Sequence, residues 1–165
     1  MIIRHSVSCL ILLAASASVY AADLRTTTAS PAFADLTAPL EIVLERDPSR
    51  VPAAKRLARL YAESRNWNAA WRVLERSAPY TGKDAEYQGF SALVLSQLKR
   101  PQEAAAYYRR AITLQSNEGR WWVGLGLALG DSGDRKGARA AFAAAQERDN
   151  TLPPVLLKVA ERQGR

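Results

Sequence analysis

Apolar side chains recur along most of this chain at intervals of three and four residues, and short polar breaks separate these stretches. Such spacing places the apolar positions on one face of an α-helix. No stretch shows the convincing alternation of apolar and polar residues that is typical of a half-buried strand. The pattern therefore predicts an all-α fold. Residues 22–31 are rich in Thr and Ala, and we expect them to form a flexible leader.

The helical pattern repeats with a 34-residue period. Five columns of residues keep this spacing without a gap: Ala58, Ala92 and Gly126; Tyr61, Leu95 and Leu129; Ala70, Ala104 and Ala138; Leu74, Tyr108 and Phe142; and Ser77, Ala111 and Ala145. Small residues let two helices approach closely, and the large residues beside them fill the remaining space. The spacing predicts three units over 51–84, 85–118 and 119–152, each made of a helix, a turn and a second helix.

The third unit carries the residues of a known repeat. It resembles a tetratricopeptide repeat (TPR) through the family's W-x2-L-G run and its later small and aromatic positions, which here are Trp122, Leu125, Gly126, Leu129, Gly133, Ala138, Phe142 and Ala145. The first unit departs most, since Ala54 stands where Trp is usual. The resemblance implies a core position for Trp122. It also implies a short right-handed TPR solenoid, flanked by an N-terminal helix or half-repeat over 32–50 and a C-terminal capping helix over 153–165.

Residues 1–21 have the parts of an export signal. A short basic start containing Arg4 precedes an apolar stretch from Val7 to Val19, and Val19 and Ala21 suit a cleavage site after residue 21. The apolar stretch is shorter than the ~20 residues that cross a bilayer. The sequence therefore predicts a signal peptide and a periplasmic or secreted protein. An uncleaved segment that anchors the chain in the inner membrane is the alternative, and it would be the chain's membrane contact.

Composition argues against catalysis. The chain has one Cys and one His, Cys9 and His5, and both lie inside the predicted signal peptide. A mature chain would offer no thiolate or imidazole for nucleophilic catalysis or metal binding. We therefore expect no enzyme activity, no catalytic residues, no cofactor and no metal site. A hydrolase that uses the carboxylates Glu63, Glu86 and Asp131 is an alternative, but no motif fixes the separation of these groups.

The chain is basic, with a formal net charge of +7 at pH 7 and an isoelectric point near 9.9. Such a charge is also found in proteins that bind nucleic acid. An exported protein rarely meets nucleic acid as its ligand, and the basic residues are spread over the whole chain. We therefore expect no nucleic-acid partner, and the charge indicates attraction to acidic partners or anionic surfaces.

The resemblance to TPR proteins implies where a ligand would lie. In that family, extended or helical peptides usually lie in a concave groove made by the first helix of each unit. The corresponding positions here are Lys55, Arg56, Arg59, Glu63, Glu86, Phe90, Leu93, Gln97, Arg120, Val123, Leu127 and Asp131.

The charges along this groove are uneven. Lys55 and Arg59 lie four residues apart on one helix face, where an acidic ligand would relieve their mutual repulsion. We therefore expect a protein or peptide ligand with an acidic or C-terminal carboxylate end near these two cations, and apolar side chains over Phe90 and Leu127. The alternative is that the basic cluster is a solvated face, and that Phe90 and Leu127 pack against neighbouring helices.

A second resemblance bears on the cellular role. The stretch SNEGRWWVGLGLALGDSGDRKGARAAFAAA is similar, through its N-x-G-x-W-W-x-G-L run, to the C-terminal TPR region of MSHA-type (type IV-like) pilus biogenesis proteins. This resemblance implies a role in the assembly of a pilus or a secretion machinery. The predicted function is that of an exported adaptor that binds protein partners. A structural subunit of an envelope complex, which associates with itself through its terminal helices, is the alternative.

Overall fold

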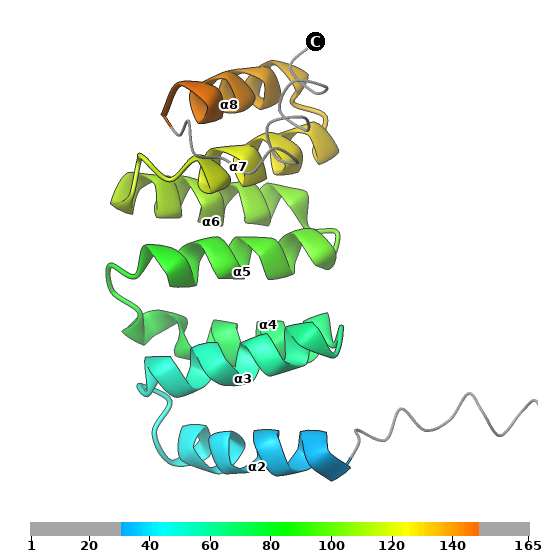
Figure 1. Ribbon diagram of the computed structural model, residues 1–165, viewed down its shortest axis with the longest axis vertical. Helices are drawn as coiled ribbons and strands as arrows, with labels where there is room; N and C mark the ends of the chain where they lie inside the picture. The colour runs from blue at the N-terminus through cyan, green and yellow to red at the C-terminus, as the bar shows by residue number, and fades with distance from the viewer. Residues whose placement is uncertain (1–30, 149–165) are drawn as a thin grey trace, which may run out of the picture. The chain divides into compact units, whose positions relative to one another are not determined.

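The computed structural model describes residues 31–148. Within that range the chain forms seven α-helices and one short 3-10 helix, and no strand (Figure 1). The predicted all-α fold is confirmed. No helix in the described range is long and apolar enough to cross a membrane. The signal peptide expected over 1–21, the capping helix over 153–165 and, apart from Pro31, the leader over 22–31 lie outside the described residues.

The helices follow the 34-residue period of the sequence. Their bounds are α2 (Pro31–Arg46), α3 (Val51–Glu63), α4 (Trp67–Ser77), η1 (Ala78–Tyr80), α5 (Ala85–Gln97), α6 (Pro101–Leu114), α7 (Gly119–Asp131) and α8 (Arg135–Arg148). The first helices of the units, α3, α5 and α7, are each 13 residues long. The chain separates into two units, residues 1–36 and 37–165, and α3 to α8 all lie in the second.

Short polar turns join the two helices of each hairpin. Asn66 Oδ1 accepts a hydrogen bond from the N–H of Ala69, and Asp134 Oδ1 accepts one from the N–H of Gly137, at 3.2 and 2.8 Å. Each side chain thereby satisfies a free donor at the start of a second helix. Each turn also contains one residue with a positive, left-handed φ angle: Arg65, Lys99 or Gly133. These three residues hold equivalent places in successive repeats, so one turn geometry recurs from hairpin to hairpin.

Consecutive helices pack side by side from α5 to α8, and α3 packs on α4 (Figure 1). The small-residue columns lie at the closest approaches: Ala58, Ala92, Ala70 and Ala104 are all fully buried. Gly126 shows how tight such an approach is, because a Cβ there would lie 2.7 Å from the ring of Phe142. Large and small residues thus alternate across the helix pairs as the sequence predicts.

The two adjacent tryptophans of α7 have different roles. Trp121 is buried and its ring lies against Gly89 of α5. Trp122 packs against the core but is only partly buried, its Nε1–H donates to the carbonyl of Ser116 at 2.8 Å, and the guanidinium of Arg148 stacks on its ring. The core position implied for Trp122 is therefore only partly correct, since Trp121 is the more deeply buried of the two.

Candidate functional site

The residues predicted to line the groove lie on the first helices α3, α5 and α7. Most of them fall into columns with the 34-residue spacing, so that they occupy equivalent turns of successive first helices. One column is Arg59, Leu93 and Leu127, a second is Glu63, Gln97 and Asp131, a third is Arg56 and Phe90, and a fourth is Glu86 and Arg120. The first two columns are exposed throughout. Leu93 and Leu127 are 42% and 41% exposed, so both offer apolar surface at equivalent turns of α5 and α7.

Val123 is a correction to the predicted set. Its side chain is 2% exposed, so it packs in the core and offers nothing to a ligand. Val123 shares its column with Lys55 and Gly89, and this column faces the neighbouring helices. The equivalent of Arg56 and Phe90 in α7 is Gly124, whose missing side chain leaves room for the ring of Tyr108.

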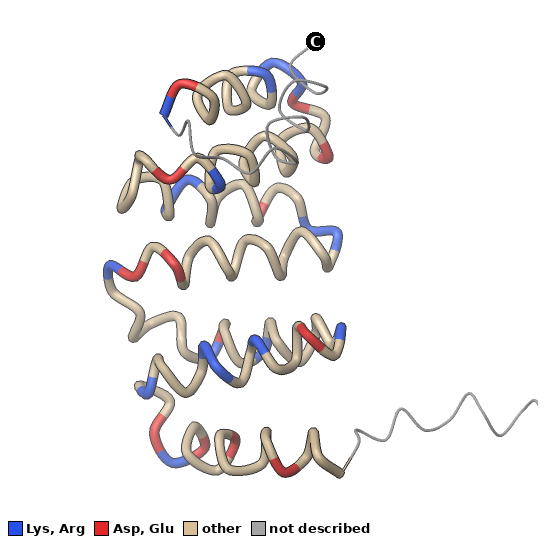
Figure 2. The backbone as a smooth tube through the Cα atoms, viewed as in Figure 1, with Lys and Arg blue, Asp and Glu red and all other residues tan. Residues whose placement is uncertain are grey.

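The four predicted residues of α3 come together at one hollow. This hollow has a volume of about 510 Å³, and its walls are Val51, Pro52, Lys55, Arg56, Arg59, Leu60, Glu63 and Asp84. Three cations and two carboxylates thus surround an apolar floor. Lys55, Arg56 and Arg59 lie within five consecutive residues of α3, where Figure 2 shows the backbone in blue.

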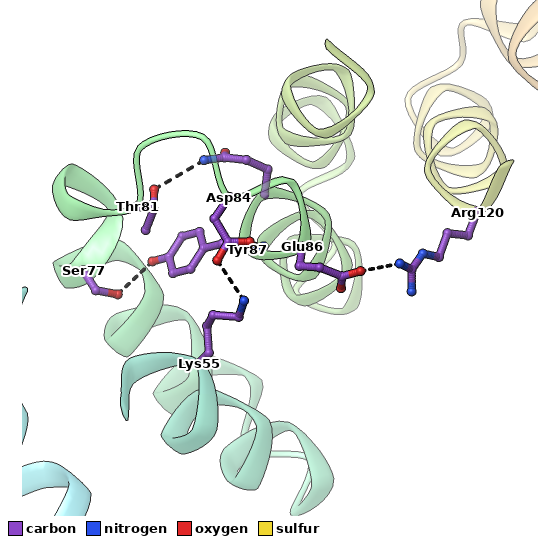
Figure 3. A network of polar contacts seen from close by, with 8 residues as sticks. Lys55, Ser77, Thr81, Asp84, Glu86, Tyr87 and Arg120 are labelled. Atoms are coloured by element: carbon purple, nitrogen blue, oxygen red, sulfur yellow. Dashed lines mark hydrogen bonds and ion pairs between the residues drawn. The ribbon is translucent and has the colours of Figure 1, made fainter. Parts of the chain in front are cut away.

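Lys55 is already engaged within the protein. Its Nζ lies 2.8 Å from Oδ2 of Asp84, whose other oxygen accepts a hydrogen bond from the N–H of Tyr87 and caps α5 (Figure 3). Partial burial raises the pKa of Asp84, but the hydrogen bonds from Lys55 and Tyr87 outweigh it, so that the pKa lies below its ordinary value. Lys55 and Arg59 therefore do not act as an equal pair of cations for a ligand carboxylate, because Asp84 neutralises the charge of Lys55.

Arg56 and Arg59 are the cations that this hollow leaves to a ligand. Both are exposed, and neither has an ion pair among the described residues. The guanidinium of Arg59 lies 5.9 Å from the ring centre of Phe90, which is within the range of a cation–π contact. Phe90 is half-buried, so the alternative in which it packs against its neighbours holds in part. Leu127 is exposed and does not bury itself between helices.

The start of α5 is tied to the start of α7 by charge. Arg120 forms an ion pair with Glu86 (Figure 3). It forms a second one with Glu118 at 2.8 Å, and its guanidinium lies over the ring of Trp121. Glu86 and Arg120 hold equivalent places in successive repeats, and both are partly exposed. Exposed ion pairs contribute little to stability, but this one occupies both side chains at one end of the predicted groove.

A polar seam of hydrogen bonds joins α4 and the residues that follow it to α5. The hydroxyl of Tyr87 lies 2.8 Å from Oγ of Ser77 and donates to the carbonyl of Leu74, and Gln88 Nε2 donates to Oγ1 of Thr81 (Figure 3). Burial raises the pKa of Tyr87 to about 12. Polar contacts of this kind fix one orientation of neighbouring elements, since each buried group loses its partner if they shift. Sequence reasoning missed Asp84 and this seam, because the partners lie on different elements of the chain.

The three carboxylates of the hydrolase alternative are far apart. Glu86 lies near the start of α5 and Asp131 at the end of α7, whose starts are paired through Arg120. Arg120, which is paired with Glu86, and Asp131 are eleven residues apart on α7, or about 16 Å along the helix axis. This is well above the roughly 5–9.5 Å between paired glycosidase carboxylates. Glu63 is at the end of α3, two repeats from Asp131. Among the described residues no group of three or more metal-binding side chain types forms a metal site.

Residues 85–118 match the tetratricopeptide repeat family. The matched segment coincides with the second unit of the sequence. The fold is that of a TPR solenoid. The sequence as a whole matches no curated protein.

Solved TPR structures are similar to this chain over most of its length. YrrB, described as a TPR protein with an unusual peptide-binding site, has a TM-score of 0.69 at 22% identity, over 79% of this chain and 67% of its own. MamA from strain MSR-1 has a TM-score of 0.64 at 23% identity, over 72% and 68%. The Sgt2 TPR domain from Aspergillus fumigatus has a TM-score of 0.55 at 18% identity, over 81% and 78%. At these identities the likeness shows the fold, and TPR proteins are in general scaffolds for protein binding rather than enzymes.

Proposed function

We propose that this chain is an adaptor that binds a protein segment across α3, α5 and α7. The observation that carries this proposal is the column of Arg59, Leu93 and Leu127, three exposed side chains at equivalent turns of successive first helices. Exposed apolar side chains that gather on one face form the kind of surface that protein partners cover. The peptide-binding site named for YrrB supports the choice of a peptide-like ligand.

The chemistry of the face favours a segment that is acidic at one end and apolar at the other. Arg56 and Arg59 stand beside the hollow of α3, while Phe90, Leu93 and Leu127 continue from it without charge. A carboxylate near the two arginines would gain charge-assisted hydrogen bonds, and the leucines would bury against apolar side chains. An acidic side chain and a C-terminal carboxylate share this chemistry.

Capture from the native cell envelope, with crosslinking and mass spectrometry, tests the proposal. Leu93→Glu/Leu127→Glu should lose the partners that the unchanged protein captures, because each new carboxylate would enter the apolar contact. Leu114→Glu is the matched control, since Leu114 is also an exposed leucine but lies on α6, outside this face. Equal capture by the double variant and the control would contradict the proposal. Arg56→Glu/Arg59→Glu tests the acidic end separately.

We also propose that the protein is exported and serves in the assembly of a pilus or a secretion machinery. The signal-peptide pattern of residues 1–21 and the N-x-G-x-W-W-x-G-L run support this role. Cell fractionation and N-terminal sequencing would then find a periplasmic or secreted protein that starts at residue 22. An intact N-terminus in the inner membrane would indicate an anchor instead. Pilus or secretion subunits should be among the partners captured by the unchanged protein, and their absence would count against this role.

A further inference from the structure

The helix α2 exposes an apolar face that the second helices of the three repeats bury. By the 34-residue period α2 is a second helix, equivalent to α4, α6 and α8. Val43 stands in the column of Ser77, Ala111 and Ala145, which are 2%, 0% and 0% exposed, yet Val43 is 41% exposed. Pro39 is exposed as well, although it stands in the column of Val73, Tyr107 and Ala141, which pack in or against the core.

The helix α8 shows which neighbour these columns face. It packs on α7, the first helix of its own repeat, and its buried residues are Ala138, Ala141, Phe142 and Ala145. Across this pair a Cβ at Gly126 would lie 2.7 Å from the Phe142 ring. On α8 these columns therefore face the first helix of the same repeat, and on α4 Ser77 of the Val43 column also meets Tyr87 of the first helix that follows. In the described part of the chain no first helix packs on Val43 and Pro39.

The residues that precede α2 do not have the pattern of that missing helix. Residues 17–29 stand one period before α3. They would place Asp23 in the buried column of Leu57 and Leu125. They would also place Leu24 in the close-packed column of Ala58, Ala92 and Gly126, where no large side chain fits. A charge and an oversized side chain at the two most buried columns argue against this segment.

Residues 153–160 do have the pattern, and the match ends at the last turn, where Arg162 stands in the buried column of Val94 and Ala128. They stand one period after α7, and Ala160 continues the column of Ala58, Ala92 and Gly126. Val159 continues the column of Leu57 and Leu125, and Leu156 that of Trp122. By the same register Ala160 would face the position of Leu40 on a second helix, as Gly126 faces Phe142. The sequence thus carries one segment with a first-helix pattern, and within residues 31–148 the second helix α2 has no first helix of its own repeat.

We propose that residues 153–165 of one copy pack on α2 of a second copy, so that the two copies together complete one repeat. Such a contact joins different surfaces of the two copies, and copies can therefore add head to tail. The solenoid would continue through the junction, since the completed repeat keeps the 34-residue register. This assembly does not depend on ligand binding by α3, α5 and α7, so either proposal can fail without the other.

Sedimentation analysis and light scattering of the purified full chain over a wide concentration range test the assembly. The average mass of the unchanged protein should rise beyond that of a dimer. Val43→Glu and Ala160→Glu should each weaken self-association at least about tenfold, because a carboxylate would enter the apolar contact. Ile42→Glu is the matched control. Ile42 is the neighbour of Val43 and is 50% exposed, but its column contains Arg76 and Arg110, which stay exposed in complete repeats.

Mixing the two blocked variants distinguishes the arrangements. Val43→Glu retains an intact C-terminal segment and Ala160→Glu retains an intact α2, so a mixture of the two should form a dimer that neither forms alone. A monomeric mixture would overturn the proposal. So would a dimer of Ala160→Glu alone, which would indicate that α2 pairs with α2. An unchanged protein that stays monomeric up to millimolar concentration would overturn it as well. Circular dichroism spectra and melting curves confirm that each variant is folded.

Discussion

Replacement of Gly89 by alanine tests the packing of the first helices directly. Gly89 is buried in the middle of α5 with ordinary helical backbone angles, and a Cβ at this position would overlap the ring of Trp121 on α7. In a helix without such a neighbour, alanine is more favourable than glycine by about 1 kcal/mol. Inserting a methyl group into a packed core costs about 1–3 kcal/mol. We therefore expect Gly89→Ala to destabilise the protein by about 1 kcal/mol.

The sign of this change is the decisive quantity. Gly130→Ala is the matched control, because a Cβ at this exposed residue of α7 would meet only Ala138, at 3.9 Å, an ordinary contact. We expect Gly130→Ala to stabilise by about 0.5–1 kcal/mol. In a Trp121→Leu background the ring is gone, so Gly89→Ala should become stabilising too. Urea unfolding followed by circular dichroism measures all three, and equal stabilisation by Gly89→Ala and Gly130→Ala would refute the reasoning.

Two further predictions concern pH. The lowered pKa of Asp84 contributes stability that is present above the ordinary value of 3.8 and lost as the pH falls through the folded value. Lys55→Met should therefore lower the urea midpoint at neutral pH, and its deficit should shrink below about pH 4. Burial, and then the hydrogen bond to Glu41, raise the pKa of Tyr61 to about 12 from 10.0, so this phenol stabilises the fold below pH 10. Between pH 10 and 12 the unchanged protein should lose stability that Tyr61→Phe does not lose, as parallel urea titrations would show.

The helical repeat could be predicted because its determinants are local and recur. Small residues at Ala58, Ala92 and Gly126 mark each close approach whatever the distant parts of the chain do. The turns are also local, since Asn66 and Asp134 cap the helices that directly follow them. For these reasons the first helices begin at residues 51, 85 and 119, where the sequence divides into units.

Only those residues of the site that follow the 34-residue spacing could be predicted from the sequence. The columns through Arg59 and Glu63 follow from the 34-residue spacing. The pairing of Lys55 with Asp84, 29 residues away, does not, because it depends on how α3 and α5 sit on one another. The prediction that Val123 lines the groove was wrong by one residue, because its side chain points into the core. Its neighbour Gly124 holds the place of Arg56 and Phe90 and has no side chain.

The hollow on α3 arises where the first unit departs from the repeat. Gly89 admits the Trp121 ring between α5 and α7, and these two helices pack directly. Lys55 occupies the equivalent position on α3, where its long side chain leaves no room for a ring and instead reaches Asp84. Tyr87, the equivalent of Trp121, turns to Ser77 on α4, and the space beside α3 stays open. A departure from the repeat pattern thus costs packing between α3 and α5, and the same departure places Arg56 and Arg59 at the edge of a hollow that a ligand can enter.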